Sequence, residues 1–188
     1  MNITLDGFMS GPDCELDWHF KSWNGEMADV AAEQLSKADT ILLGRITYRA
    51  MARYWPMQSI NILTPRGDIA FADMMNNYAK IVFTKTLKKP EWNNSRIINR
   101  DIESEVEQMK KEQGKDMIIY GSGQIVSALM KANLVDEFHI WVHPVIIGKG
   151  KTLFRDLTKD LRLELFRTKR FSSGVVLFYY EYQKEFHI

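Results

Sequence analysis

The sequence predicts an α/β fold, with a mostly parallel sheet, helices on both of its faces and an antiparallel C-terminal end. Two observations indicate this fold. Through the first two-thirds of the 188 residues, short apolar runs alternate with segments of helical periodicity, which is typical of strand–helix–strand units. Near the end, two alternating runs flank residues 172–174 and predict a closing hairpin. The length favours one domain over residues 1–188, with a flexible tail at about 184–188.

Strands and helices are expected in alternation along the first half of the chain, after a very short opening strand. Good helix formers fill residues 25–39, and residues 40–44 form the apolar run of a buried strand. Residues 47–55 predict a further helix. Thr47 is the expected N-cap of this helix, and Pro56 is expected to end it.

The second half continues the pattern and then changes it. Further strands are expected at residues 80–84, 95–99, 117–121 and 137–147, and further helices at residues 68–79, 101–114 and 123–134. Pro144 is expected to bend the strand 137–147 or to place it near an edge of the sheet. Residues 162–171 and 175–183 form the hairpin. In sheets of this kind, ligands lie off the carboxyl ends of the parallel strands.

Composition and charge exclude several classes of protein. The chain has 25 basic and 24 acidic residues, a formal net charge of +1, and so lacks the basic footprint of a nucleic-acid-binding protein. No apolar run approaches the length of a membrane-spanning helix, so no membrane span is expected. Cys14 is the only cysteine, which excludes an intrachain disulfide and suits a reducing cytoplasm.

Two strand-to-helix junctions are candidates for a ligand site. At the first, Gly44 follows an apolar strand, and Arg45 and Thr47 enter the next helix. At the second, residues 121–123 read Gly-Ser-Gly. Small residues and free backbone N–H groups at a helix N-terminus favour an anion, and two such junctions would suit a dinucleotide. A tight turn without a ligand remains the alternative for either junction alone. Val126 replaces the third glycine of the usual dinucleotide fingerprint.

Thr84 and Lys85 form a third candidate, because they leave the carboxyl end of a strand. A hydroxyl and an ammonium group there would suit a ribose 2′-phosphate and so would favour NADPH over NADH. The alternative is a solvated run of positive charge, since Lys88 and Lys89 follow.

Several segments together resemble a known family. The segments "ITLDGFMSG", "ILLGRITYRAM", "IVFTKTL" and "IYGSGQIVSALMKANLVDEFHIWVHPVIIGKGKTLF" occur in this order. They look like the dihydrofolate reductase-like family, and most closely its branch similar to the reductase (C-terminal) domain of riboflavin biosynthesis. The resemblance implies a three-layer α/β/α fold with a mostly parallel eight-stranded sheet. It also implies NADPH as the cofactor and a homodimer as the assembly.

The resemblance assigns the cofactor to the three junctions. The residues that it implies for the pyrophosphate region are Gly44, Arg45 and Thr47 on one side and Gly121, Ser122, Gly123, Gln124 and Ile125 on the other. Thr84 and Lys85 would approach the adenosine 2′-phosphate. The segment "TLDGF" would lie near the nicotinamide.

The substrate side is less defined. The carboxylate that folate-reducing relatives carry on their first helix falls at Ala28, and the neighbouring Asp29 is rotated by roughly 100° on a helix. Asp6 and Asp17 are the candidate catalytic carboxylates, although Asp6 could simply cap the turn at Gly7. Trp18, Asp29 and Trp55 are the candidate substrate-pocket residues, and ordinary packing is the alternative for both tryptophans.

His139, Trp141 and His143 should share one face of their strand, because side chains alternate with a period of two. A metal site or an acid–base pair is conceivable there. A structural role is preferred, because no carboxylate or cysteine lies beside these residues in sequence, and no metal is expected. The strand could also line a dimer interface.

The sequence therefore leads to two hypotheses. The first is a cytoplasmic, NADPH-dependent oxidoreductase that transfers hydride to a small flat heterocyclic or carbonyl substrate, with a pterin or pyrimidine as the type. The second is a non-catalytic nucleotide-binding or scaffolding homodimer, which the missing helix carboxylate motivates. Neither hypothesis involves nucleic acid or a membrane.

Overall fold

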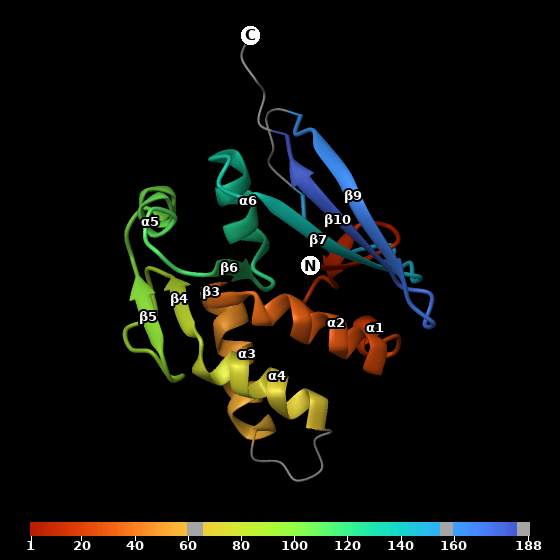
Figure 1. The fold of residues 1–188 in the computed structure, drawn as a ribbon, viewed down its shortest axis with the longest axis horizontal. Coiled ribbons are helices and arrows are strands. Elements are labelled where there is room, and N and C mark those ends of the chain that lie inside the picture. The colour runs from red at the N-terminus through yellow and green to blue at the C-terminus, as the bar shows by residue number, and fades with distance from the viewer. Residues whose placement is uncertain (60–65, 155–159, 184–188) are drawn as a thin grey trace. The chain divides into compact units, whose positions relative to one another are not determined.

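The computed structural model describes residues 1–59, 66–154 and 160–183 of the chain (Figure 1). The chain forms two compact units. One consists of Gly25–Ile125, and the other of Met1–Asn24 together with Val126–Ile188. The tail expected at about 184–188 lies outside the described residues.

The unit Gly25–Ile125 contains a four-stranded sheet in the order β5-β4-β3-β6. Its strands are β3 (Ala38–Gly44), β4 (Ala79–Phe83), β5 (Ser95–Ile98) and β6 (Asp116–Ile119), and its helices are α2 (Gly25–Ser36), α3 (Arg45–Gln58), α4 (Arg66–Asn77) and α5 (Ile102–Met109). All three strand pairs are parallel. The parallel part of the predicted sheet is therefore confirmed.

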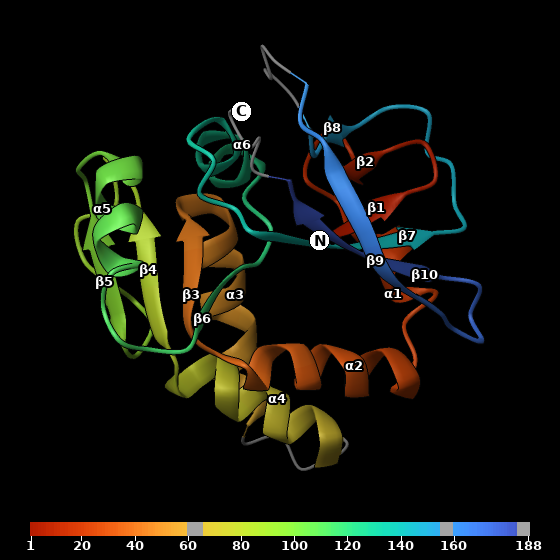
Figure 2. The same cartoon turned by 45° about the horizontal axis from the view of Figure 1, so that its top comes forward.

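The order of the strands places helices on both faces of this sheet. The connection from β3 to β4, through α3 and α4, runs in one direction across the sheet, and the connection from β5 to β6, through α5, runs in the other. Because such crossovers are right-handed, opposite directions put their helices on opposite faces. Figure 2 draws α3 and α5 on the two sides of these strands. The three-layer α/β class is confirmed.

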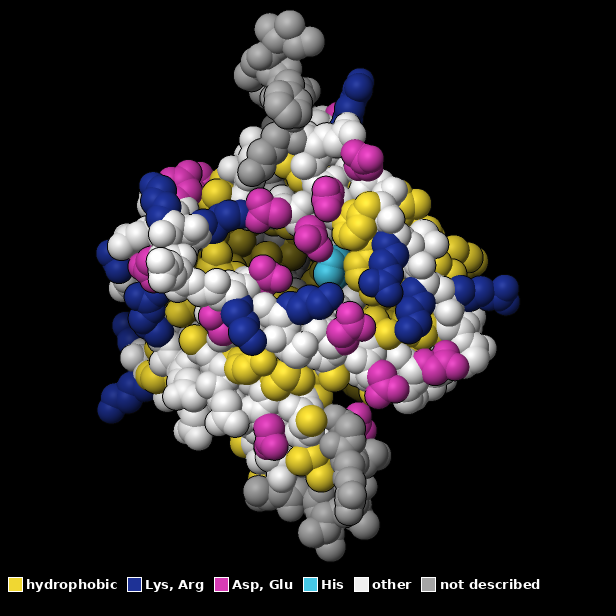
Figure 3. Space-filling model, viewed as in Figure 1, with side chains coloured by type: hydrophobic (Ala, Val, Ile, Leu, Met, Phe, Trp, Pro, Cys, Tyr) yellow, Lys and Arg dark blue, Asp and Glu magenta, His cyan; other side chains and the backbone are white. Residues whose placement is uncertain are grey.

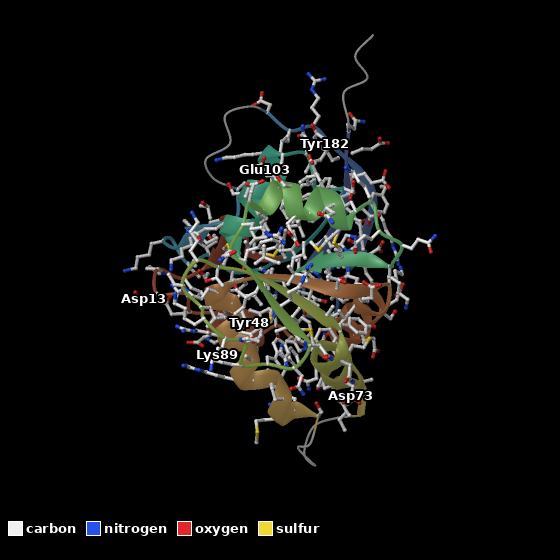
Figure 4. The ribbon with its side chains drawn as sticks, turned by 90° about the vertical axis from the view of Figure 1, so that its left-hand side faces the viewer. Asp13, Tyr48, Asp73, Lys89, Glu103 and Tyr182 are labelled. Atoms are coloured by element: carbon white, nitrogen blue, oxygen red, sulfur yellow. The ribbon has the colours of Figure 1, made fainter. Side chains whose placement is uncertain are left out.

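The core of this unit is formed by side chains of the sheet, of the helices α2, α3 and α4, and of the loop after β4. Leu35, Ile41, Leu43, Tyr48, Met75, Val82, Leu87 and Trp92 form one buried cluster. Tyr48 lies among these side chains in Figure 4, and its hydroxyl accepts hydrogen bonds from the backbone N–H groups of Glu91 and Trp92 at 2.8 Å. The loop after β4 is thus tied to α3, which fixes where that loop leaves the sheet.

Two expectations about α3 are wrong. Gly44, with extended backbone angles and no side-chain cap, precedes the helix, and Thr47 lies inside its first turn. Pro56 lies inside α3, which continues to Gln58. A proline removes one backbone hydrogen bond, a cost that packing in the last turn can offset. Here the Trp55 ring packs against Phe71, with ring centres 5.1 Å apart, and the Trp55 carbonyl accepts from Asn76.

The other unit contains a second four-stranded sheet in the order β1-β7-β10-β9, and a two-stranded pair. The strands are β1 (Asn2–Thr4), β7 (Glu137–His143), β9 (Leu163–Arg170) and β10 (Val176–Tyr182), with β2 (Phe8–Ser10) paired to β8 (Lys151–Thr152). The strands β9 and β10 form the predicted antiparallel hairpin. Where the resemblance implied one eight-stranded sheet, the described strands form two four-stranded sheets and the pair β2–β8.

The position of β7 corrects another expectation. The strand β7 ends at His143, directly before Pro144, and both of its edges are paired, to β1 and to β10. Pro144 therefore neither bends the strand nor places it at an edge, since it follows the last residue that needs a ladder hydrogen bond. With both edges paired, β7 has no free edge to offer to a second chain.

Two further helices, α1 and α6, lie outside the layers described above. The short helix α1 (Asp17–Phe20) lies before residue 25, where the first helix was expected, and α6 (Gly123–Lys131) follows β6 as expected. Among the helices of the described residues, none is both long and apolar enough to cross a membrane.

Candidate functional site

The two glycine-containing junctions lie side by side at the carboxyl edge of the parallel sheet. The strands β3 and β6 are neighbours, so the turn at Gly44 and the turn at Gly121–Ile125 meet at this edge. The chain leaves β3 toward β4 on one side, and β6 lies on the other side of β3. Ligands of open α/β sheets bind where the direction of the connections changes in this way. We call Gly44–Thr47 together with Gly121–Ile125 the nucleotide cradle.

Ser122 joins the two halves of the cradle. Its Oγ accepts a hydrogen bond from the backbone N–H of Gly44 at 2.7 Å and donates one to Thr47 Oγ1 at 2.9 Å. Ser122 also has a φ of 57°, in the left-handed region that a residue other than glycine seldom adopts. Backbone strain of this kind persists where the surroundings enforce it, and it gathers at ligand sites.

The glycines of the cradle allow its two turns to approach each other closely. A Cβ atom at Gly44 would lie 2.9 Å from Ser122 Oγ, so a side chain there would displace the hydroxyl that joins the two turns. Gly121 has a φ of 63°, and a Cβ atom there would lie 2.9 Å from Thr47 Cγ2. Both glycines are therefore needed to bring the two turns together.

The first turn of α3 presents backbone donors to a ligand, whereas the N–H groups of Gly44 and Ile125 already have partners within the cradle. The N–H groups of the first turn of a helix have no partner within the helix, and no side chain caps α3 at Gly44. Arg45 is partly buried in this turn and has no ion pair among the described residues, while Gln124 is exposed at the start of α6. Backbone donors, helix dipoles and a guanidinium group together suit a pyrophosphate.

Thr84 and Lys85 follow β4, the strand next to β3 on the other side from β6. Thr84 Oγ1 accepts hydrogen bonds from the N–H groups of Thr86 and Leu87, both at 3.2 Å, so the hydroxyl fixes the turn after the strand. Lys85 is exposed and forms no ion pair among the described residues. The turn thus holds a free ammonium group at the same edge of the sheet as the cradle.

The predicted catalytic carboxylates lie in the other unit, in different surroundings. Asp6 accepts a hydrogen bond from Thr4 Oγ1 at 2.6 Å and others from the N–H groups of Ile147 and Gly148. The bond from Thr4 is the largest of the causes that lower the pKa of Asp6 below its ordinary value. Asp17, at the start of α1, is exposed. Asp6 therefore fastens a turn as an ionised carboxylate, and its catalytic role stays a prediction.

The three predicted pocket residues are placed by packing. Asp29 is exposed on α2, whose buried positions include Met27 and Val30. Trp55 packs at the rim of the core described above. Trp18 is 9% exposed, in the other unit. Trp18 and Trp55 thus belong to different units, and Asp29 supplies no buried carboxylate on α2.

Sequence reasoning missed a cluster of polar rings in the unit that contains α1. The rings of Trp18, His19 and His143 form a triangle, with centres 5.1 to 6.1 Å apart. Trp18 Nε1, His19 Nε2 and His143 Nδ1 are buried and have no hydrogen-bond partner among the described residues. Burial lowers the pKa of His19 and the pKa of His143 to about 4 each, so both imidazoles are neutral near pH 7.

No signal in the sequence pointed to this cluster, because no helix was expected at residues 17–20 and His143 is more than a hundred residues away. His143 was grouped by its period with His139 and Trp141 on β7. His139 instead lies beside Glu137, with 2.9 Å between His139 Nε2 and a Glu137 carboxylate oxygen. In the part of the chain that the structure describes, no three His, Cys, Asp or Glu side chains gather as metal ligands.

Comparison with known proteins gives a consistent result. The model of the RibD C-terminal domain family matches residues 1–177. The chain is 33% identical over 180 residues to the uncharacterized protein YyaP of Bacillus subtilis (strain 168), an alignment that covers 96% of this chain and 91% of YyaP. It is 29% identical over 177 residues to the uncharacterized protein YwjB of the same organism, with 94% and 92% covered.

Solved structures share the fold at low sequence identity. A putative riboflavin biosynthesis protein from Shewanella sp. PV-4 matches with a TM-score of 0.74 and 17% identity, over 98% of this chain and 97% of that one. A diaminohydroxyphosphoribosylaminopyrimidine deaminase/5-amino-6-(5-phosphoribosylamino)uracil reductase from Thermotoga maritima matches with a TM-score of 0.65 and 15% identity. This chain corresponds to 55% of that longer chain, with 97% of its own residues covered.

Proposed function

The chain belongs to the RibD C-terminal domain family, and we propose that it is an NADPH-dependent reductase that transfers a hydride to a small, flat heterocyclic or carbonyl substrate. The observation that carries this proposal is the bridge through Ser122, which joins two helix N-termini at the carboxyl edge of a parallel sheet. A dinucleotide has a central pyrophosphate that needs such a pair of donor-rich turns.

The residues present fit NADPH. When bound, the cofactor supplies the hydride, and the protein supplies binding, orientation and electrostatics. The backbone N–H groups of the cradle and the Arg45 guanidinium would hold the pyrophosphate. The Lys85 ammonium would bind the 2′-phosphate that distinguishes NADPH from NADH. Thr84 would fix the turn that carries Lys85.

The reaction also requires a proton. Asp6 is occupied by hydrogen bonds that stabilise its ionised form, which suits the orientation of a turn better than the release of a proton. Asp17 is exposed at the start of α1. We therefore assign the delivery of the proton to Asp17, directly or through a water molecule, and an orienting role to Asp6.

The proposed substrate class is a pterin or pyrimidine ring. Support comes from the names of proteins that share the fold: a pyrimidine reductase-like protein of Corynebacterium diphtheriae matches with a TM-score of 0.64 and 14% identity, over 98% of this chain and 90% of that one. The absence of a buried carboxylate on α2 argues against folate itself. A cytoplasmic homodimer completes the proposal, from the family resemblance and the single cysteine.

Titration of the purified protein with NADPH and NADH, followed by tryptophan fluorescence, tests the proposal. We expect Lys85→Gln to weaken NADPH binding by about tenfold or more and to leave NADH binding unchanged, because a charge-assisted phosphate contact is lost. Arg45→Gln should weaken both nucleotides alike, since both carry the pyrophosphate. Lys89→Gln, which removes an exposed lysine from the same loop, is the control.

Failure of both nucleotides to bind would overturn the proposal. Binding of both without turnover of any pterin, pyrimidine or quinonoid acceptor would favour the alternative, a non-catalytic nucleotide-binding or scaffolding homodimer. Substitution of Gly121 is a poor test, because a side chain there would meet Thr47 before it met a ligand.

A further inference from the structure

A chain of hydrogen bonds crosses the nucleotide cradle from one turn to the other and back. The backbone N–H of Gly44 donates to Ser122 Oγ at 2.7 Å, and Ser122 Oγ donates to Thr47 Oγ1 at 2.9 Å. A hydroxyl group carries a single proton, so the bond to Thr47 uses the proton that Ser122 has. The Thr47 hydroxyl keeps its own proton, which has no acceptor among the described residues. The chain of bonds therefore ends in a free donor on Thr47.

The direction of this chain is set by its first member. A backbone N–H can only donate, so the N–H of Gly44 occupies a lone pair of Ser122 Oγ and leaves the Ser122 proton to point onward. Successive hydrogen bonds that run in one direction polarise one another, and they are stronger where water is partly excluded. Ser122 and Thr47 are both partly buried. The Thr47 hydroxyl is therefore a better donor than an isolated threonine hydroxyl in water.

The position of Thr47 favours an anion as the acceptor of this proton. Thr47 lies in the first turn of α3, where the backbone N–H groups lack partners within the helix and the helix dipole attracts negative charge. Figure 3 shows acidic and basic side chains interspersed over the face that it draws, and the net charge is only +1. A broad positive field thus contributes little to anion binding, which depends instead on local donors such as this hydroxyl.

Ser122 itself has little left to offer to an anion. Its proton goes to Thr47, one lone pair is occupied by Gly44, and a further lone pair would repel a phosphate oxygen. Its Oγ is also held against the backbone of the first turn, since a Cβ atom at Gly44 would lie only 2.9 Å away. The φ of 57° at Ser122 and the bond from the Ile125 N–H to the Ser122 carbonyl, at 2.8 Å, fix this arrangement.

We propose that Ser122 is a positioning residue, whose hydroxyl holds the Thr47 hydroxyl as the donor that contacts the pyrophosphate of the nucleotide, and that Ser122 does not touch the nucleotide. The inference rests on the NADPH site of the proposed function and divides the roles within it. Gly44 starts the chain, Ser122 orients and polarises the next hydroxyl, and Thr47 makes the contact.

Single substitutions give the first test, by titration with NADPH followed by tryptophan fluorescence. Thr47→Val should raise the dissociation constant by about tenfold or more, because a hydrogen bond to a charged acceptor is lost. Thr47→Ser keeps a hydroxyl at the same place and should restore binding to within about twofold of the wild type. Ser122→Ala should raise the dissociation constant by about three- to tenfold, since the contact remains but is no longer oriented or polarised.

A double-mutant cycle separates positioning from direct contact. In the Thr47→Val background, Ser122→Ala should have no further effect on NADPH binding, because no hydroxyl is left for Ser122 to orient. If Ser122 touched the phosphate, or served only to hold the two turns together, its substitution would weaken binding by the same factor in both backgrounds. Equal factors would therefore overturn the inference.

Adenosine 2′-monophosphate is the matched control ligand, because it carries the 2′-phosphate and lacks the pyrophosphate. Ser122→Ala should leave its dissociation constant unchanged, whereas Lys85→Gln should raise it by about tenfold or more. Weaker binding of this ligand to Ser122→Ala would show a general distortion of the site and would contradict a role confined to the pyrophosphate.

Ser122→Gly keeps the test valid if Ser122→Ala folds poorly. Glycine removes the same hydroxyl and accepts a φ of 57° without strain, so urea unfolding of the ligand-free variant should show no loss of stability, while NADPH binding should weaken as in Ser122→Ala. Unchanged or tighter NADPH binding by either variant would overturn the inference and leave the NADPH site in place. Failure of the wild type to bind NADPH would instead overturn the proposed function.

Discussion

Buried ionisable side chains are accommodated differently in the two compact units. In Gly25–Ile125, the Lys80 side chain is completely buried, and its Nζ donates to three backbone carbonyl oxygens at 2.8 to 2.9 Å. In the other unit, the rings of His19 and His143 have centres 5.2 Å apart, and each keeps a buried nitrogen without a partner among the described residues. One unit pairs its buried cation, and the other keeps its buried groups neutral.

The physical reason lies in what surrounds each group. The carbonyls that Lys80 satisfies belong to Met75, Asn76 and Tyr78, at the end of α4, where a helix leaves carbonyl groups unpaired and its dipole favours a cation. The Lys80 ammonium also lies 4.4 Å from the centre of the Trp92 ring. Burial lowers the pKa of Lys80 to about 8, which still leaves the group protonated near pH 7.

Of the substitutions that test this comparison, Lys80→Met is expected to change the stability most. The variant keeps a long apolar stem but leaves three carbonyls unpaired, so the free energy of unfolding should fall by about 3 kcal/mol. Urea unfolding followed by circular dichroism measures the change. Lys37→Met, at an exposed lysine paired with Glu33, should change the free energy by less than about 0.5 kcal/mol. A loss below 1 kcal/mol for Lys80→Met would show that water replaces the ammonium group.

Acid should destabilise the protein through the histidine pair. The folded-state pKa of about 4 for His19 and for His143 lies below the ordinary value of 6.5, so the unfolded chain takes up protons first as the pH falls. The stability that these groups contribute is complete above about pH 6.5 and is lost toward pH 4, by on the order of 1–3 kcal/mol. Urea unfolding at intervals between pH 4.5 and 7 measures this loss.

His19→Gln should make the loss of stability with falling pH less steep, because the variant retains only one of the two imidazoles with a lowered pKa. His139→Gln, at a partly exposed histidine beside Glu137, should leave the slope as it is. Equal slopes in the wild type and in His19→Gln would show that the pair is not the source of the pH dependence.

The smallest effect is expected at the nearly buried carboxylate of Glu105. Its side chain is 9% exposed, and its two oxygens lie 3.2 Å from the guanidinium groups of Arg96 and Arg100, which are 56% and 71% exposed. Arg100→Ala should therefore cost only about 0.5 kcal/mol in urea unfolding, since water and Arg96 remain. A loss of more than about 2 kcal/mol would show that Glu105, like Lys80, depends on each of its partners.

Local patterns were enough to locate the elements near the cradle. The apolar run before Gly44 and the one before Gly121 are strands, each followed by a helix, and parallel neighbours necessarily end at the same edge. Details that depend on competing forces were missed. Thr47 looked like a cap and Pro56 like a terminator, but α3 begins at Arg45 and runs past Pro56 because packing around Trp55 offsets the cost.

By itself, the sequence determined the α/β class, the closing hairpin, the three junctions at the edge of the parallel sheet and the resemblance to a reductase family, because these follow from periodicity, glycine placement and local motifs. Only the tertiary structure decided that Ser122 joins Gly44 across 78 residues, that His19 meets His143, and that β7 is paired on both of its edges. Contacts between residues far apart in sequence depend on how strands are ordered in a sheet, and one sequence carries no local signal for that order.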